Sequence, residues 1–171
     1  MLNKKVEKAL NAQIKIEAES SQAYLAMAGW AELNGFQGVS AFLYTHSDEE
    51  RMHMLKLIKF VNDRGGKAVI PSLAQPTDSF KDLHQLFSVL LSHETRVTAE
   101  INTVVDICLR EKDYTTHNFM QWYVSEQIEE ETLARNIMDK LKLIGNDKGA
   151  LYIFDSDIER IGGGAGKEAA E

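Results

Sequence analysis

The placement of proline constrains this chain more than any other feature of its sequence. Only 2 of its 171 residues are proline, and both, Pro71 and Pro76, lie in one short stretch. Proline breaks helix interiors because it lacks the amide N–H and clashes with the preceding turn, so the rest of the chain is free to form long helices. The sequence therefore predicts an all-α fold and disfavours an all-β one.

Breaker and capping residues divide the chain into four long segments and one short segment. We expect helices over residues of about 4–33, 38–64, 80–111, 114–144 and 148–160. Helix ends are indicated by glycines, and helix starts by the N-cap candidates Thr77, Asp78, Ser79 and Asp113. The loop over residues 65–78 could stretch roughly 45 Å at about 3.3 Å per residue, which is enough to cross a whole bundle.

The length and composition of the chain fit one domain. Hydrophobic residues make up 44% of the chain and charged residues 26%, so a core of ordinary size can form. We expect this domain to span residues 1–161. Residues 162–171 contain no apolar side chain larger than alanine, and we expect a flexible tail there.

The charge balance and the single cysteine bear on partners and location. Nineteen basic and 26 acidic residues give a formal net charge of −7, which repels nucleic acid and anionic membranes and suits cations, so neither is an expected partner. Cys108 has no cysteine partner within the chain, and the first residues lack the apolar stretch of an export signal. We therefore expect a cytoplasmic protein.

Each long segment carries one glutamate in the middle of its apolar stripe. When residues are followed in alternating steps of four and three, Glu94 falls between Leu90 and Val97 in an otherwise apolar row. The same reading places the following residues at the centres of the other three stripes: Glu17, Glu50 with His53, and Glu130. At about 1.5 Å per residue, Glu94 and Glu130 lie roughly 26 Å from their shared bend. Glu17 and Glu50 lie roughly 27 and 21 Å from theirs, so all four are expected at nearly one height.

Four ionised carboxylates cannot share a dry core unless something neutralises them. Each costs several kcal/mol to desolvate, and like charges repel at short range. Two divalent cations would balance the four glutamates, and His53, three residues after Glu50, adds a nitrogen ligand. Mixed carboxylate and imidazole ligands suit iron or manganese. We expect a dinuclear iron site.

Three motifs carry a resemblance to a known family. They are KIEAE at residues 15–19, DEERMHM at 48–54 and QWYVSEQIEEE at 121–131. At these residues the chain resembles the bacterial non-haem ferritins, and the resemblance runs from about residue 3 into the last expected helix. It implies a ferritin-like four-helix bundle with a long crossover between the second and third helices and a short fifth helix at the C-terminus.

The resemblance also implies which residues bind iron. One ion would lie among Glu17, Glu50 and His53, and a second would use Glu50 as a bridge together with Glu94 and Glu130, with Gln127 close by. A third position would use Glu49, Glu126 and Glu129. The family further implies a ferroxidase that oxidises Fe(II) with O2 or H2O2 and stores ferric oxyhydroxide inside a homo-oligomeric cage of 24 subunits.

One departure from the symmetric di-iron pattern bears on haem. The fourth segment reads Gln127-x-x-Glu130 where haem-containing bacterioferritins carry a second Glu-x-x-His. Arg51 follows Glu50, in place of the methionine that binds haem in those proteins. We therefore expect no haem.

Several alternatives stay open at this stage. Tyr24 could hydrogen-bond a ligand, donate an electron or simply pack in the core, and a solvated acidic face also explains Glu49, Glu126 and Glu129. His46 fits a core histidine better than a residue that supports a ligand. For the whole chain, the rival functions are a peroxidase or monooxygenase acting on a separate substrate, and a metal-free helical interaction module with a polar seam.

Overall fold

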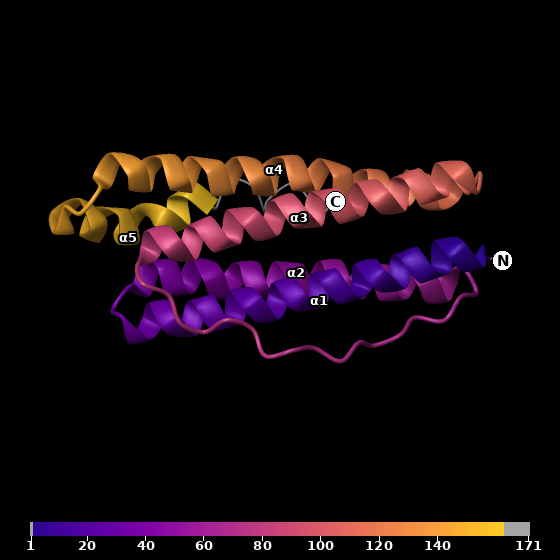
Figure 1. The fold of residues 1–171 in the computed structure, drawn as a ribbon, viewed down its shortest axis with the longest axis horizontal. Coiled ribbons are helices and arrows are strands. Elements are labelled where there is room, and N and C mark those ends of the chain that lie inside the picture. The colour runs from indigo at the N-terminus through magenta and orange to yellow at the C-terminus, as the bar shows by residue number, and fades with distance from the viewer. Residues whose placement is uncertain (1, 163–171) are drawn as a thin grey trace.

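The computed structural model describes residues 2–162, and every regular element there is a helix (Figure 1). The helices are α1 (Lys4–Leu33), α2 (Gln37–Asp63), α3 (Leu83–Arg110), α4 (Tyr114–Ile144) and α5 (Lys148–Gly162). The predicted all-α architecture is confirmed, including the short fifth helix. Of the predicted tail, Gly162 is the last residue of α5, and residues 163–171 lie outside the described residues.

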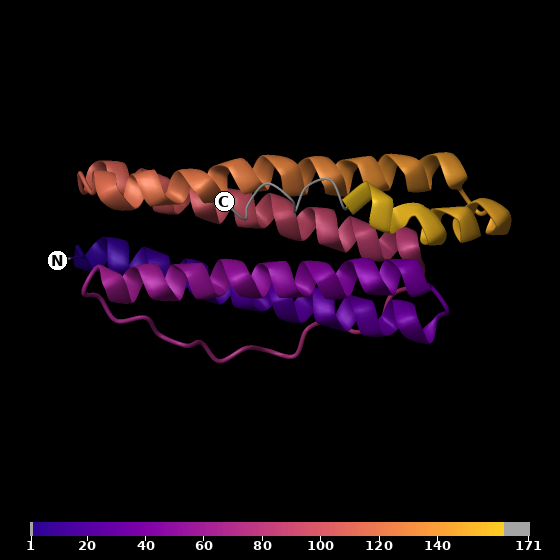
Figure 2. The ribbon, with the colours of Figure 1, turned by 180° about the vertical axis from the view of Figure 1, so that it is seen from behind.

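The four long helices form two antiparallel pairs that lie side by side. Figures 1 and 2 show α1 paired with α2 and α3 paired with α4, with α5 beside one end of the bundle. The connection from α2 to α3 runs along the outside of the first pair for nearly its whole length, so α2 and α3 point in the same direction. The predicted crossover is therefore present.

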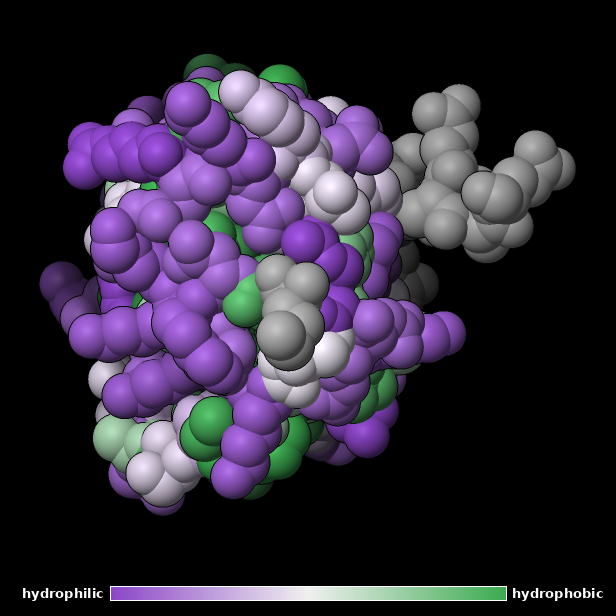
Figure 3. Space-filling model, turned by 90° about the vertical axis from the view of Figure 1, so that its right-hand side faces the viewer, coloured by the Kyte–Doolittle hydropathy of each residue, from purple (hydrophilic) through white to green (hydrophobic). Residues whose placement is uncertain are grey.

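The surface at one end of the bundle is mostly polar. Figure 3 looks onto the end where the N-terminus and the turn between α3 and α4 lie, and most of the visible surface there is hydrophilic. Among the described helices, none combines the length and apolar character that crossing a membrane requires.

The predicted helix ends at glycine are present and have a clear geometry. Gly65 adopts a φ of 72° just after α2, and the amide of Gly66 donates to the carbonyl of Val61 at 2.9 Å. This pattern satisfies carbonyls that the last helical turn leaves free. After α3 the same left-handed position is filled by Lys112, with a φ of 56°, so the glycine signal is absent from the sequence there.

The start of α3 differs from the sequence-based expectation. The N-cap is Asp82, whose side chain accepts from the amide of Gln85 at 2.8 Å, so the helix begins at Leu83 and not near residue 80. The side chain of Gln85 accepts in turn from the amide of Lys81 at 2.6 Å. This reciprocal pair of bonds outcompetes the predicted caps at Thr77, Asp78 and Ser79. At the start of α4, by contrast, Asp113 caps the helix as predicted.

The apolar core consists of two clusters with polar side chains between them. One cluster lies toward α5 and includes Met27, Leu43, Leu86 and Ile137. The other lies toward the N-terminus and includes these residues: Leu10, Leu57, Ile101 and Met120. In every long helix the boundary between the clusters falls at the central glutamate, which confirms that the four glutamates share one height.

Candidate metal centre

Three of the predicted ligands meet between α1 and α2. Glu17 lies in the middle of α1, and Glu50 and His53 lie one turn apart on α2. The Nδ1 atom of His53 is 3.6 Å from Oε2 of Glu50 and 3.9 Å from Oε2 of Glu17. These separations exceed a hydrogen bond but leave room for a cation with ligand bonds of about 2.1 Å.

Glu50 is the member of this group whose bonding is least complete. Its side chain is 3% exposed, and its buried Oε2 atom has no hydrogen-bond partner among the described residues. A buried acceptor without a donor costs about 1–3 kcal/mol, and more when it is charged. The donor set of two carboxylates and one imidazole therefore fits a bound cation, which would satisfy this oxygen.

Burial and mutual repulsion raise the pKa of each central carboxyl. Burial, followed by the charge of Glu50, raises the pKa of Glu17 well above its usual range. Burial is also the largest cause for the other three, raising the pKa of Glu50 and Glu130 to about 8 and that of Glu94 to about 7. Without a cation, this cluster holds protons at neutral pH. With one, those protons are released.

Glu94 is held by side chains from two neighbouring helices. The hydroxyl of Tyr24 on α1 donates to its Oε1 atom, and Nε2 of Gln127 on α4 donates to its Oε2 atom at 3.1 Å. Gln127 also lies 3.2 Å from the hydroxyl oxygen of Thr98. Gln127 lies beside the glutamate cluster, as the resemblance implies, and Tyr24 makes the bond to a predicted ligand that was one of its open alternatives. Both bonds orient the Glu94 carboxylate.

Glu130 belongs to a second group that the sequence did not single out. Its Oε2 atom lies 3.8 Å from Nε2 of His46, and Nδ1 of His46 lies 3.8 Å from Oε2 of Glu49. One ligand atom from each of the three residues lies within 4.8 Å of the other two. Nδ1 of His46 is also 3.0 Å from the carbonyl oxygen of Phe42, which explains its place in the core. His46 therefore both packs in the core and faces two predicted ligands.

The remaining two predicted ligands lie at the edge of the cluster. Among the described residues, Glu126 and Glu129 join neither group of potential ligands. Burial is the largest cause raising the pKa of Glu126, with Glu129 and Glu49 adding repulsion. The structure thus brings Glu49 together with His46 and Glu130, and leaves a third ion position at Glu49, Glu126 and Glu129 as a prediction.

Gln13 is a buried neighbour of the cluster that sequence reasoning missed. Its Nε2 atom donates to Oε1 of Glu17 at 2.7 Å, one helical turn away on α1. The buried Oε1 atom of Gln13 has no partner among the described residues. A glutamine four residues before a central glutamate was the only signal in the sequence, and many exposed helix faces carry the same spacing.

The arrangement of four helices around a carboxylate and histidine cluster matches one family. The sequence matches the ferritin family model, described as a ferritin-like domain, over residues 7–144. The chain belongs to the ferritin family.

Individual ferritins resemble this chain over most of its length. It is 44% identical over 161 residues to a bacterial non-haem ferritin of Campylobacter jejuni, covering 94% of this chain and 96% of that protein. A probable bacterial non-haem ferritin-like protein of Haemophilus influenzae is 41% identical, with coverage of 94% and 98%. Among solved structures, an open-pore ferritin of Archaeoglobus fulgidus superposes with a TM-score of 0.91 at 38% identity, covering 92% of this chain and 98% of that one.

Proposed function

We propose that this ferritin oxidises Fe(II) to Fe(III) at a dinuclear centre and stores the product as ferric oxyhydroxide in a cytoplasmic cage of 24 identical subunits. The proposal includes no haem. It draws on family membership for storage and assembly, and on the glutamate cluster for the oxidation.

The position of Glu50 is the observation that supports oxidation at a dinuclear centre. Its carboxylate lies beside His53 and Glu17, and the charge of Glu130 adds to its raised pKa. A carboxylate with two oxygens between two sets of ligands can bridge two ions. One iron would be held by Glu17, Glu50 and His53, and the other by Glu50, Glu94 and Glu130.

Two adjacent Fe(II) ions make a two-electron oxidation possible. With dioxygen, each iron gives one electron and two protons are taken up, so that O2 + 2 Fe(II) + 2 H⁺ gives H2O2 + 2 Fe(III). The buried carboxylates would lower the energy of the more highly charged product ions. Gln127 and Tyr24 would hold Glu94 in position, and Glu49, Glu126 and Glu129 would receive iron as it leaves the pair.

Replacing Glu50 or His53 with alanine tests the proposal. In an aerobic assay of Fe(II) oxidation by absorbance, we expect the initial rate to fall at least tenfold in both variants. Glu32→Ala is the matched control, because Glu32 is an exposed glutamate near the end of α1. An unchanged rate in Glu50→Ala would overturn the assignment of the dinuclear centre. Size-exclusion mass and mineral content would separate storage from a peroxidase acting on a separate substrate.

A further inference from the structure

Gln13 of α1 bonds to a predicted iron ligand and is not itself one of the predicted ligands. It is 1% exposed, and its Nε2 atom donates to Oε1 of Glu17 at 2.7 Å, one helical turn further along. The other oxygen of that carboxylate, Oε2, lies 3.9 Å from Nδ1 of His53. The two oxygens of Glu17 therefore have different surroundings. One is held by an amide of its own helix, and the other lies beside a second predicted ligand.

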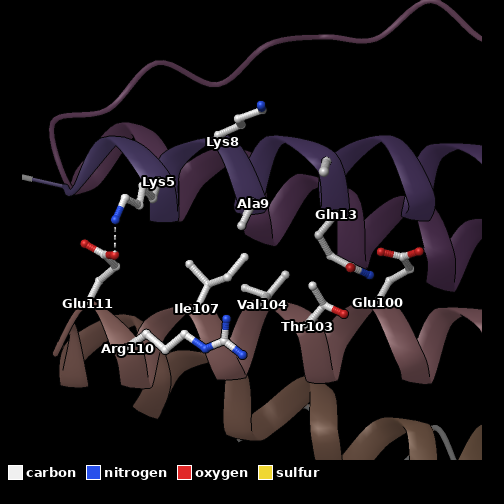
Figure 4. A pocket seen from close by; sticks show the side chains of 11 residues that line it. Lys5, Lys8, Ala9, Gln13, Glu100, Thr103, Val104, Ile107, Arg110 and Glu111 are labelled. Carbon is white, nitrogen blue, oxygen red and sulfur yellow. Dashed lines mark hydrogen bonds and ion pairs between the residues drawn. The ribbon is translucent and has the colours of Figure 1, made fainter.

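The amide oxygen of Gln13 makes this residue a costly choice for packing alone. This Oε1 atom is buried and has no hydrogen-bond partner among the described residues. Gln13 lines a cavity between α1 and α3 (Figure 4), but the oxygen atom itself is closed to solvent, so water in the cavity does not satisfy it. An apolar side chain of similar volume would avoid the free-energy cost of an unsatisfied buried acceptor. Such a side chain would not provide the bond from Nε2 to Glu17.

A neutral donor suits a carboxylate that has to bind a cation. A hydrogen bond to one oxygen fixes the direction of the carboxylate and leaves the other oxygen free for the ion. A lysine or arginine at the same place would neutralise Glu17 and repel the incoming ion. When an ion is bound, Glu17 is ionised and only accepts hydrogen bonds, so the amide nitrogen of Gln13 faces it.

We propose that Gln13 is a positioning residue for the iron ion at Glu17, Glu50 and His53. By holding Oε1 of Glu17, it directs Oε2 of the same carboxylate toward that ion. The inference rests on the proposed function. Gln13 acts on the ion only through Glu17, and this role accounts for a buried amide with one unsatisfied atom beside the centre.

The Gln13→Met variant tests the inference, because methionine keeps roughly the volume of glutamine and donates no hydrogen bond. Gln13→Leu takes its place if that variant does not fold. Gln22→Met is the matched control, since Gln22 is exposed on the same helix. Crystals of each protein are soaked anaerobically in a series of Fe(II) concentrations, and the anomalous peak height at the iron edge is followed separately at the two iron positions.

We expect the Glu17 position in Gln13→Met to need about tenfold more Fe(II) to reach half of its maximal peak height, because the hydrogen-bond partner of a ligand is lost. The position at Glu94 and Glu130 should shift by about twofold at most, since it does not use Glu17. Gln22→Met should leave both positions unchanged. In the soaked original protein, Oε1 of Glu17 should keep its bond to Gln13 while Oε2 binds the ion.

Three results would overturn the inference: no shift at the Glu17 position, equal shifts at both positions, or iron bound to Oε1 of Glu17 in the original protein. A merely structural role for Gln13 predicts the first of these, together with a lower unfolding temperature of metal-free Gln13→Met. Absence of iron from both positions in the original protein would overturn the proposed function, and the inference with it, which is a separate outcome.

Discussion

Tyr24 of α1 donates a hydrogen bond to Oε1 of Glu94 on α3, although the two residues lie 70 positions apart in the chain. The bond crosses between the two helix pairs at the height of the metal centre. It fixes the direction of a carboxylate that Gln127 holds from the other side. One aromatic hydroxyl thus links the packing of the bundle to the geometry of a predicted iron ligand.

Removing this hydroxyl should affect both stability and oxidation. We expect Tyr24→Phe to lower the free energy of unfolding by about 1–2 kcal/mol, because one buried hydrogen bond is lost. We also expect it to slow Fe(II) oxidation about two- to tenfold. Tyr44→Phe is the matched control, since Tyr44 is partly exposed and donates to Glu32 far from the cluster. Equal effects of the two substitutions in both assays would contradict a role for the Tyr24 bond.

The raised pKa values predict how stability depends on pH in the metal-free protein. Between the usual value of 4.5 and about 8, the folded protein keeps protons on Glu50 and Glu130 that the unfolded chain has released. The free energy of unfolding therefore falls as the pH rises through this window. Each group contributes up to about 1.4 kcal/mol per pH unit.

Denaturant titrations from pH 7 to 9 would measure this dependence. That range lies above the lowered pKa values of His46 and His93, whose protonation would act in the opposite direction. The Glu50→Gln variant should show a smaller decrease between pH 7 and 8, because the amide does not ionise. A stability that rises over this range would be inconsistent with buried carboxyls at the centre.

Metal binding should offset the free-energy cost of burying the central carboxyl groups. We expect anaerobic Fe(II), at a concentration one hundred times its dissociation constant, to stabilise the folded protein by about 2.7 kcal/mol. In Glu50→Gln this gain should largely disappear, while the metal-free variant should unfold at a higher temperature than the original protein at pH 8. Thermal unfolding with and without Fe(II) checks both effects. If Fe(II) left the unfolding temperature of the original protein unchanged, the metal-free interaction module would become the better hypothesis.

The docking of α5 depends on a glycine in the first turn of α2. A Cβ atom at Gly38 would overlap the main-chain carbonyl oxygen of Asp155, whose side chain also accepts from the amide of Val39 at 2.9 Å. We expect Gly38→Ala to destabilise the protein by about 2–3 kcal/mol through displacement of α5. Gly29→Ala is the control: nothing outside its own helix lies within 4 Å of the added Cβ, so it should stabilise by up to about 1 kcal/mol. Thermal unfolding of both variants distinguishes the effect of the close contact with α5 from the effect of the higher helix propensity of alanine.

Much of the fold and the centre of the site could be predicted from sequence, because both depend on helical periodicity. The spacing of apolar residues placed Glu17, Glu50, Glu94 and Glu130 on buried stripes, and distances from the bends placed them at one height. The start of α3 could not be predicted in this way. Thr77, Asp78 and Asp82 offer similar side chains, and only the additional bond from Gln85 decides among them.

The surroundings of the centre were harder to predict than its middle. His46 gains its role from Glu130 on another helix, and periodicity along one helix does not contain that information. Gln13 bonds Glu17 on its own helix, but the same spacing occurs on many exposed helix faces and does not by itself indicate a bond. Glu126 and Glu129 lie close to the cluster in sequence. Whether their carboxylates can reach one shared iron ion depends on the directions of their side chains. A third iron position there stays a prediction that ion placement can test.

Anomalous diffraction at the iron edge, from crystals soaked anaerobically in Fe(II), tests the central claim most directly because it counts and places the ions. We predict one peak within bonding distance of Glu17, Glu50 and His53, and a second that shares Glu50 and is bound by Glu94 and Glu130. Iron found only on the surface, with no peak among these five side chains, would contradict the account.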